Sequence, residues 1–217
     1  MDLGIRGKLA KGAFRYDFST FFLRYKNRIG LGETIVTDSL LNIDKVVDFR
    51  TNIGDAGIFG LETYLEADFW KLWSKKDATP FSLSTFLNIS LQHGRYLSGP
   101  TNYKGNQVEL IPPISAKTGL NFRWKDLSTS YQIAYVGQHY TDATNAEFVA
   151  NATRGIIPAY LVQDLSLSYK YKWLGFNAGI NNLANAAYFT RRSTAYPGPG
   201  ILPAEGRSFY LGLSVRL

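Results

Sequence analysis

Arginine is the residue type with the clearest capacity for chemistry in this sequence. Its planar guanidinium presents paired N–H donors that match a carboxylate or a phosphate. The 217 residues include 24 lysines and arginines against 17 aspartates and glutamates, so the formal net charge is +7. Candidate contacts for an anionic ligand lie near the long connections of the chain: Arg95, Arg154, Arg191, Arg192 and Arg207, with His93 and Gln107 as weaker candidates.

Other chemistries have little support in the sequence. Cysteine is absent, which excludes disulfides, thiolate metal ligands and cysteine nucleophiles. Two histidines, His93 and His139, are too few for a histidine-built metal or catalytic site. Glu62, Glu66 and Asp68 alternate along one segment, and we interpret them as a hydrated wall balanced by lysine or arginine from neighbouring strands, with a metal or a second domain as the alternative contact. We expect no catalytic residue, no metal site and no cofactor.

The basic balance also raises the question of nucleic-acid binding, since the isoelectric point is near 9.5. The charges are scattered over loops and polar strand faces. They are not gathered on one face with aromatic side chains on which bases could stack. We therefore expect no nucleic-acid partner.

The elements that must position the arginines are β-strands. Nine segments alternate apolar and polar residues with a period of two, which is typical of strands with two different faces. These segments are residues 3–9, 14–22, 61–69, 83–91, 119–124, 127–135, 159–173, 174–181 and 209–217. No segment has a convincing helical pattern, and none approaches the ~20 apolar residues of a membrane helix.

The connections between these segments alternate strictly between short and long. Long ones are expected at residues 30–46, 94–115, 142–159 and 185–207, and shorter ones lie between them. All four tryptophans, at positions 70, 73, 124 and 173, lie at or beside the shorter turns, as in an interfacial aromatic girdle. The sequence therefore predicts an all-β fold, a transmembrane antiparallel β-barrel of a bacterial outer membrane. A soluble β-sandwich is the alternative.

Nine strands place the two chain ends on opposite sides of the membrane, whereas single-chain barrels of this kind have an even number. We therefore expect about nine meander strands of a larger barrel. Residues 46–52 could hide a further strand, which is the alternative explanation of the odd count.

Three segments near the end of the chain, and two upstream, form a recognisable set: Asn181–Arg192, Tyr196–Pro203 and Gly206–Leu217, with Gly60–Thr63 and Gly105–Val108 before them. With these segments the last part of the chain resembles the final hairpin of TonB-dependent outer-membrane receptors, most closely the ferric dicitrate type. Two departures are the final Leu217, where the family usually has Phe, and Ala184–Asn185, where Phe-Asp is common.

The resemblance implies a 22-stranded barrel, an N-terminal plug and a segment that contacts TonB. It covers roughly the last nine or ten strands, so residues 1–217 are expected to be a C-terminal part of the barrel domain, with the plug domain absent and TonB contact made only through missing N-terminal parts.

The implied function is import of a ferric siderophore or a citrate-like ferric carboxylate complex, without enzymatic activity. The alternatives are another cargo, such as an oligosaccharide, a peptide, cobalamin or heme, or a soluble sheet protein that binds a ligand. Arg191, Arg192 and Arg207 are the leading ligand contacts because they bracket the longest loop. Outer-membrane lipid and the phosphates of lipopolysaccharide are competing partners for the same arginines.

Overall fold

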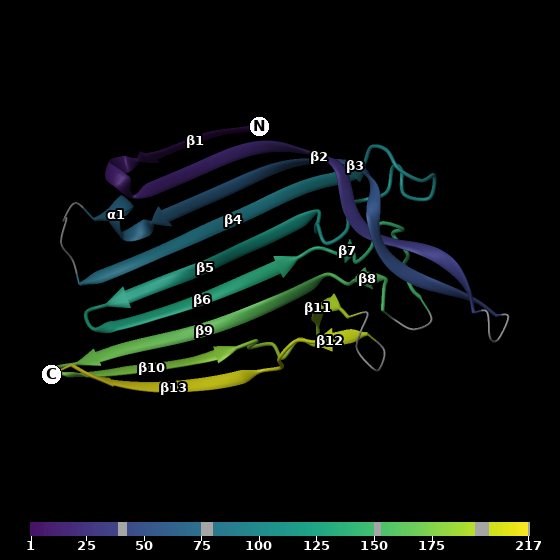
Figure 1. Cartoon of the computed structure of the whole chain (residues 1–217). Helices are drawn as coiled ribbons and strands as arrows, with labels where there is room; N and C mark the ends of the chain where they lie inside the picture. The colour runs from purple at the N-terminus through teal and green to yellow at the C-terminus, as the bar shows by residue number, and fades with distance from the viewer. Residues whose placement is uncertain (39–42, 75–79, 150–152, 194–199, 217) are drawn as a thin grey trace.

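The computed structural model describes residues 1–38, 43–74, 80–149, 153–193 and 200–216. Nine of its strands form a single antiparallel sheet in which each strand pairs with its neighbours in the order that follows (Figure 1). They are β1 (Asp2–Leu9), β2 (Phe14–Asp38), β3 (Ile43–Asp68), β4 (Phe81–Tyr96), β5 (Ile114–Trp124), β6 (Leu127–Val136), β9 (Tyr160–Tyr171), β10 (Leu174–Asn181) and β13 (Ser208–Val215). The predicted nine-stranded meander is confirmed.

The two faces of the sheet differ in polarity as the alternation predicts. One face is apolar and open, and its side chains include Leu120, 49% exposed, and Leu211, 76% exposed. The other face is hollow and polar, and a cavity of about 660 Å³ is lined by residues such as Arg15, Ser84 and Asn177 from strands far apart in the sheet. No second layer covers the apolar face among the described residues, so this face has the character of a surface that contacts lipid.

Polar groups on the apolar face are bonded within the sheet. Thr85 donates its hydroxyl to the Gly119 carbonyl at 2.9 Å, and Thr118 donates to the Phe86 carbonyl at 2.7 Å. Across β6 and β9, the Tyr131 hydroxyl donates to Gln163 Oε1 at 2.7 Å. Internal bonding of this kind is what a hydrocarbon environment demands, because no water is present to replace it.

The aromatic side chains mark the end of the sheet that carries the short turns. Trp73, Trp124 and Trp173 are 90%, 52% and 57% exposed there. Trp70 instead packs edge-on against Phe81, with ring centroids 4.6 Å apart. The described C-terminus lies at this end and the N-terminus does not (Figure 1), as the odd strand count predicts.

Two short helical turns correct the expectation of no helix. A 3-10 turn, η1, spans Ala10–Gly12, and α1 spans Phe69–Trp73. Asp68 caps α1 by accepting the Lys71 backbone N–H at 3.0 Å, which starts the helix where the alternation predicted the end of a strand. None of the described helices is long and apolar enough to cross a membrane.

The long connections are more ordered than the sequence predicts. Residues 30–46 were expected to be a loop, but β2 and β3 continue as a paired ribbon to Asp38 and from Ile43. Residues 46–52 belong to this ribbon and add no strand to the wall. Two further connections contain short paired strands, β7 (His139–Tyr140) with β8 (Ile156–Ile157), and β11 (Phe189–Arg192) with β12 (Ile201–Pro203).

The ribbon bends across the loop end of the sheet (Figure 1). The bend coincides with a bulge in β2, where Asn27 has φ 52° and donates its N–H to Asp55 Oδ1 at 3.1 Å. Gly54 and Gly99, both at positive φ, meet backbone to backbone there: a Cβ on Gly54 would lie 2.0 Å from the Ser98 carbonyl oxygen. Only glycine permits this approach.

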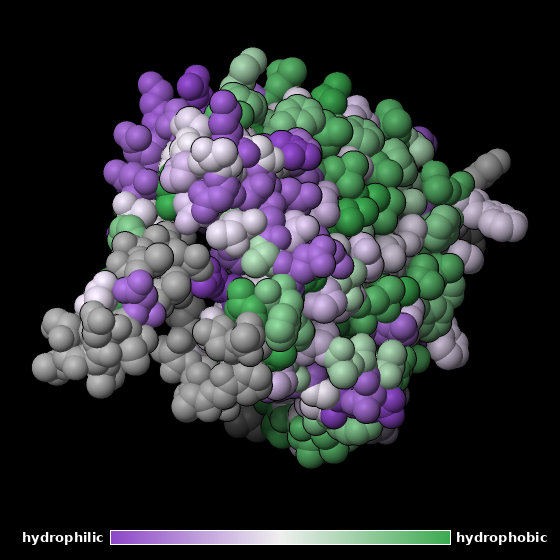
Figure 2. All heavy atoms as spheres, turned by 90° about the vertical axis from the view of Figure 1, so that its right-hand side faces the viewer, coloured by the Kyte–Doolittle hydropathy of each residue, from purple (hydrophilic) through white to green (hydrophobic). Residues whose placement is uncertain are grey.

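The buried core of the described chain lies among the loops. We call it the loop core, and it comprises Ile53, Ala56, Ile58, Tyr96, Tyr103, Val108 and Ala143. These residues come from the ribbon base, the end of β4, the β4–β5 connection and the β6–β9 connection. The sheet directs many of its hydrophobic side chains outward, whereas the buried hydrophobic residues form a compact cluster at its loop end. Figure 2 views this end and shows hydrophilic side chains gathered beside a hydrophobic flank.

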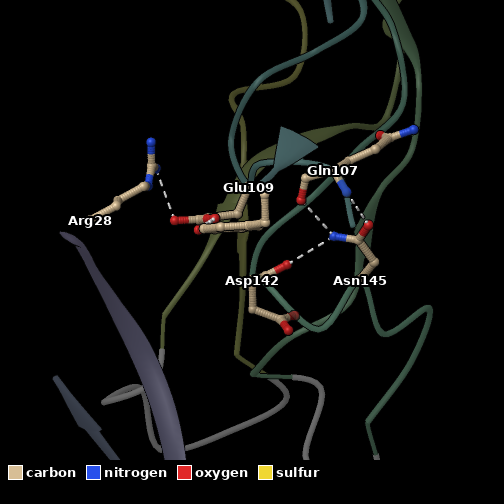
Figure 3. Close-up of polar contacts among 6 residues, drawn as sticks. Arg28, Gln107, Glu109, Asp142 and Asn145 are labelled. Atoms are coloured by element: carbon tan, nitrogen blue, oxygen red, sulfur yellow. Dashed lines mark hydrogen bonds and ion pairs between the residues drawn. The ribbon is translucent and has the colours of Figure 1, made fainter. Parts of the chain in front are cut away.

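Polar contacts tie the same connections together (Figure 3). Arg28 Nη2 on the ribbon forms an ion pair with Glu109 Oε1 at 2.9 Å, and the buried Tyr96 hydroxyl donates to Glu109 Oε2 at 2.5 Å. Asn145 pairs with the Gln107 backbone through both ends of its side-chain amide, at 2.7 and 2.9 Å. Burial and the bond to Glu109 raise the pKa of Tyr96 far above its ordinary value.

The two faces of β5 give the first testable consequence. Replacing Leu120 with Arg puts a charge on the apolar face near mid-strand, and should lower the free energy of unfolding in lipid vesicles by about 2 to 4 kcal/mol. The matched control is Asn121→Arg, one residue along on the hollow face, which should cost far less. Urea titration of the barrel in vesicles measures both, and equal losses would contradict the assignment of the faces.

The loop core gives a second testable prediction. Glu109→Ala leaves Arg28 and Tyr96 without their shared acceptor, so the connections should open more readily, by about 1 to 3 kcal/mol. Amide hydrogen exchange measures this directly, because the Val108 and Tyr96 N–H groups bond to Gly94 and Asn106 carbonyls. Glu205→Ala, an exposed glutamate in another connection, is the control. Unaltered exchange in Glu109→Ala would show that the ion pair does not hold the connections.

Candidate functional site

Three of the predicted arginines line one cavity at the loop end. Arg154 precedes β8, and Arg191 and Arg192 end β11. Together with Leu110 and Thr141 they surround a volume of about 550 Å³. The remaining lining residues are Thr153, Ser193 and Leu202. Residues distant in the sequence thus bring three arginines to the lining of one cavity.

Arg192 is fixed in this cavity by its surroundings. Its Nη2 donates to the Ile156 carbonyl of β8 at 3.0 Å, and its guanidinium lies over the Phe189 ring, 5.0 Å from the centroid. Desolvation lowers the pKa of Arg192 from its ordinary value, but a guanidinium stays protonated at physiological pH. Arg192 therefore supplies a positive charge in a set orientation.

A second cavity of about 220 Å³ shares Leu110 and Thr141 with the first. The ribbon contributes Ile29, Gly30 and Arg50 to its lining, and Asp142 closes another side. The structure therefore adds Arg50 beside the arginine cavity. Leu110 and Thr141 had no signal in the sequence, because their role as a shared wall depends on how three connections pack.

The other predicted site residues lie apart from the arginine cavity. Arg207 is exposed just before β13, and its backbone N–H donates to Asn185 Oδ1 at 2.9 Å. Gln107 lies in the β4–β5 connection, where its backbone pairs with Asn145. His93 and Arg95 lie at the loop end of β4, and Arg95 Nε donates to His93 Nε2 at 2.9 Å. These four residues do not line the cavity.

The carboxylates of the hollow face have structural partners. Glu66 Oε2 lies 3.4 Å from Arg15 Nη1 on the neighbouring strand and accepts the Tyr64 hydroxyl at 3.1 Å. Asp68 is occupied as the cap of α1. Arg15 is the compensating charge that the hydrated-wall interpretation predicts. The described residues contain no group of three or more histidine, cysteine, aspartate or glutamate side chains arranged to hold a metal ion.

The chemistry available at the arginine cavity is recognition of negative charge. Guanidinium groups can hold carboxylate or phosphate oxygens through paired hydrogen bonds. They are always protonated, so they neither accept a proton nor attack a bond. The cavity is suited to bind an anion and to release it unchanged.

Comparison with known proteins supports this architecture. The chain is similar in structure to the ferric citrate transporter FecA in its unliganded form, with TM-score 0.76 and 20% identity. It is also similar to the siderophore receptor PiuA from Acinetobacter baumannii (TM-score 0.67, 17% identity) and to the ferric yersiniabactin uptake receptor FyuA from Yersinia pestis (TM-score 0.69, 17% identity). Each alignment covers 99% of this chain. None of the curated protein sequences matches the chain.

This chain spans less than a third of the length of those three structures: 30% of FecA, 28% of PiuA and 29% of FyuA. At these identities the likeness shows the fold. The family assignment comes from the sequence model of the TonB dependent receptor-like β-barrel, which matches residues 1–183. The chain therefore belongs to the TonB-dependent receptor β-barrel family, whose members are receptors and transporters of bacterial outer membranes and not enzymes.

Proposed function

We propose that this chain forms part of the wall and the ligand-facing loops of a receptor that imports a ferric siderophore or a ferric carboxylate complex. The observation that carries the proposal is the cavity of about 550 Å³ lined by Arg154, Arg191 and Arg192. Its volume falls within the ~300 to 1,000 Å³ of small-molecule sites. Its charge suits a chelate that carries unneutralised carboxylates.

Electrostatics favours capture of such a ligand from solution. Several like charges in a hollow with low-dielectric walls raise the local concentration of an oppositely charged ligand and speed its association. The loop core holds the ribbon and two connections in place next to the cavity. Ligand binding therefore loses less conformational entropy, because these segments are already ordered. A citrate-like ferric complex is the cargo that best fits three arginines, and the fold likeness to the ferric citrate transporter agrees with it.

The arc of nine strands is proposed to be completed by further strands of the same barrel. In the described sheet, β1 and β13 each pair with one neighbour only. An open edge within a membrane would leave backbone groups unsatisfied. A 22-stranded wall, with a plug and a TonB-contacting segment outside residues 1–217, would supply both closure and coupling to energy.

A test of the ligand assignment compares two sets of arginines in the complete receptor. Replacing Arg154 and Arg191 together with Gln should weaken binding of ferric dicitrate by about tenfold or more, because each removes charge-assisted hydrogen bonds. Arg192 is left intact, since it also holds β8 in place. Ligand-dependent fluorescence quenching measures the dissociation constant at several salt concentrations, and the affinity of the unaltered receptor should fall as salt rises.

Arg207→Gln is a control for net charge, since it removes one positive charge from the loop end, half as many as the double variant, at a residue that does not line the cavity. It should leave the affinity within about twofold, a change of less than ~0.5 kcal/mol. Equal affinity in the double variant and the unaltered receptor would remove these arginines from the ligand site. Loss of affinity in Arg207→Gln of the same size would mean that net charge, and not the cavity, governs binding.

A further inference from the structure

Two arginines on the apolar side of the sheet form a pattern that ligand import does not use. In the strand register, Arg24 of β2 pairs with Gly57 of β3, and Gly57 pairs in turn with Arg95 of β4. Directly paired residues of an antiparallel sheet share a face. Arg24 and Arg95 therefore project from the same face on either side of a glycine, with their Cα atoms roughly two strand spacings, or 10 Å, apart.

The row immediately below is aromatic and faces the same way. Phe22 pairs with Phe59, and Phe59 pairs with His93. Phe22 and Phe59 are 46% and 49% exposed, on the outward apolar face. The arginine row thus directly borders the apolar band on its loop side.

Strand length places this border at the surface of the bilayer. A tilted strand crosses the hydrocarbon in ~9 to 11 residues. Counted from Phe81, where β4 begins near the tryptophans, this span ends close to Leu91. The row of Phe22, Phe59 and His93 lies two residues beyond that point, and Arg95 lies four residues beyond it. The rings therefore stand at the boundary between acyl chains and headgroups, and Arg95 stands at the level of the headgroups.

The guanidiniums are anchored but not saturated. Arg95 donates from Nε to His93 Nε2 and from Nη1 to the Gly105 carbonyl, at 2.9 and 2.6 Å. Arg24 Nη2 lies 3.6 Å from Asp55 Oδ2, and the Arg24 side chain is 57% exposed. Within the described part of the chain, Arg24 Nη1 and Arg95 Nη2 have no hydrogen-bond partner, so both can donate outward. Leu97, also exposed, packs over Gly57 between them and adds apolar contact.

We propose that Arg24 and Arg95 bind the phosphate of an outer-leaflet glycolipid whose acyl chains begin beside Phe22 and Phe59. The two guanidiniums suit a phosphate, although Arg24 shares its charge with Asp55, and the exposed rings beneath them suit the headgroup ends of acyl chains. A free anion would gain nothing from the rings. A lipid gains from both rows at once, and its binding would fix the outer surface of β2, β3 and β4 where the loop core begins.

The test measures binding of diphosphorylated lipid A to the complete receptor in detergent micelles, counted by native mass spectrometry. The double variant R24Q/R95Q should bind at least about tenfold more weakly. The matched control is R15Q/R123Q, which removes the same charge from the hollow face of the same sheet and should bind as the unaltered receptor does. A second arm uses lipid A from which both phosphates have been removed. Its binding to the unaltered receptor should be weak, and equal to the binding of diphosphorylated lipid A to R24Q/R95Q.

Three results would overturn the proposal. Unchanged binding in R24Q/R95Q would remove the two arginines from the site. An equal loss in R15Q/R123Q would show a general effect of charge. Displacement of the lipid by inorganic phosphate at equal concentration would show a free-anion site in place of a lipid site. The ferric dicitrate affinity of R24Q/R95Q should remain that of the unaltered receptor, which separates this proposal from the function proposed for the arginine cavity.

Discussion

Satisfaction of backbone hydrogen bonds without water is the constraint on which the rest of this structure depends. In hydrocarbon each unpaired N–H or C=O group costs several kcal/mol, so only helices and closed sheets cross a membrane. Here nine strands pair continuously in an antiparallel ladder. Even the outward Thr85, Thr118 and Thr129 donate their hydroxyls to carbonyls within the sheet. The period of two follows, because one side of each strand meets lipid and the other meets water.

The same constraint explains why the buried core lies outside the wall. A single-layer sheet between lipid and a hydrated interior has nothing to pack against, so its side chains stay accessible on both faces. Beyond the membrane, water returns and ordinary burial can stabilise structure. The loop core forms there from Ile53, Tyr96 and Val108, with the Arg28 and Glu109 ion pair beside it. The arginine cavity is built next to this ordered region, which holds its wall in position.

The fold could be predicted from the sequence wherever the two environments impose alternation. This alternation predicts the wall strands, the tryptophan girdle and the end of the sheet at which each terminus lies. The ribbon was missed because residues beyond the membrane are free of that pattern, and Gly30 and Gly32 resemble turn residues. The helix α1 was missed because Asp68 ends the alternation by capping, which a period count does not detect.

The site could be predicted in part for related reasons. The three arginines of the cavity, Arg154, Arg191 and Arg192, come together because β8 and β11 lie close to each other. No local pattern in the sequence predicts that contact. His93 and Arg95 were grouped with them, although the alternation itself assigns them elsewhere. They lie two and four residues beyond the outward Leu91, so both belong to the outward face. Extending the strand pattern past the membrane boundary would have separated these two from the ligand candidates.

The central claim is that one face of the sheet meets lipid and the other meets water. Residues 1–217 contain no cysteine, so in a membrane-inserted receptor freed of any cysteine elsewhere, single cysteines can be placed at residues 115–118 and 120–124 and labelled with a nitroxide. Gly119 is left unchanged, because a Cβ there would lie 2.7 Å from the Tyr131 carbonyl oxygen. Electron paramagnetic resonance then compares collision with oxygen, which is enriched in lipid, and with a nickel chelate, which stays in water. The structure predicts that oxygen contact is high at 116, 118, 120 and 122 and that chelate contact is high at 115, 117 and 121. Uniform accessibility along the segment, or the opposite phase, would contradict it.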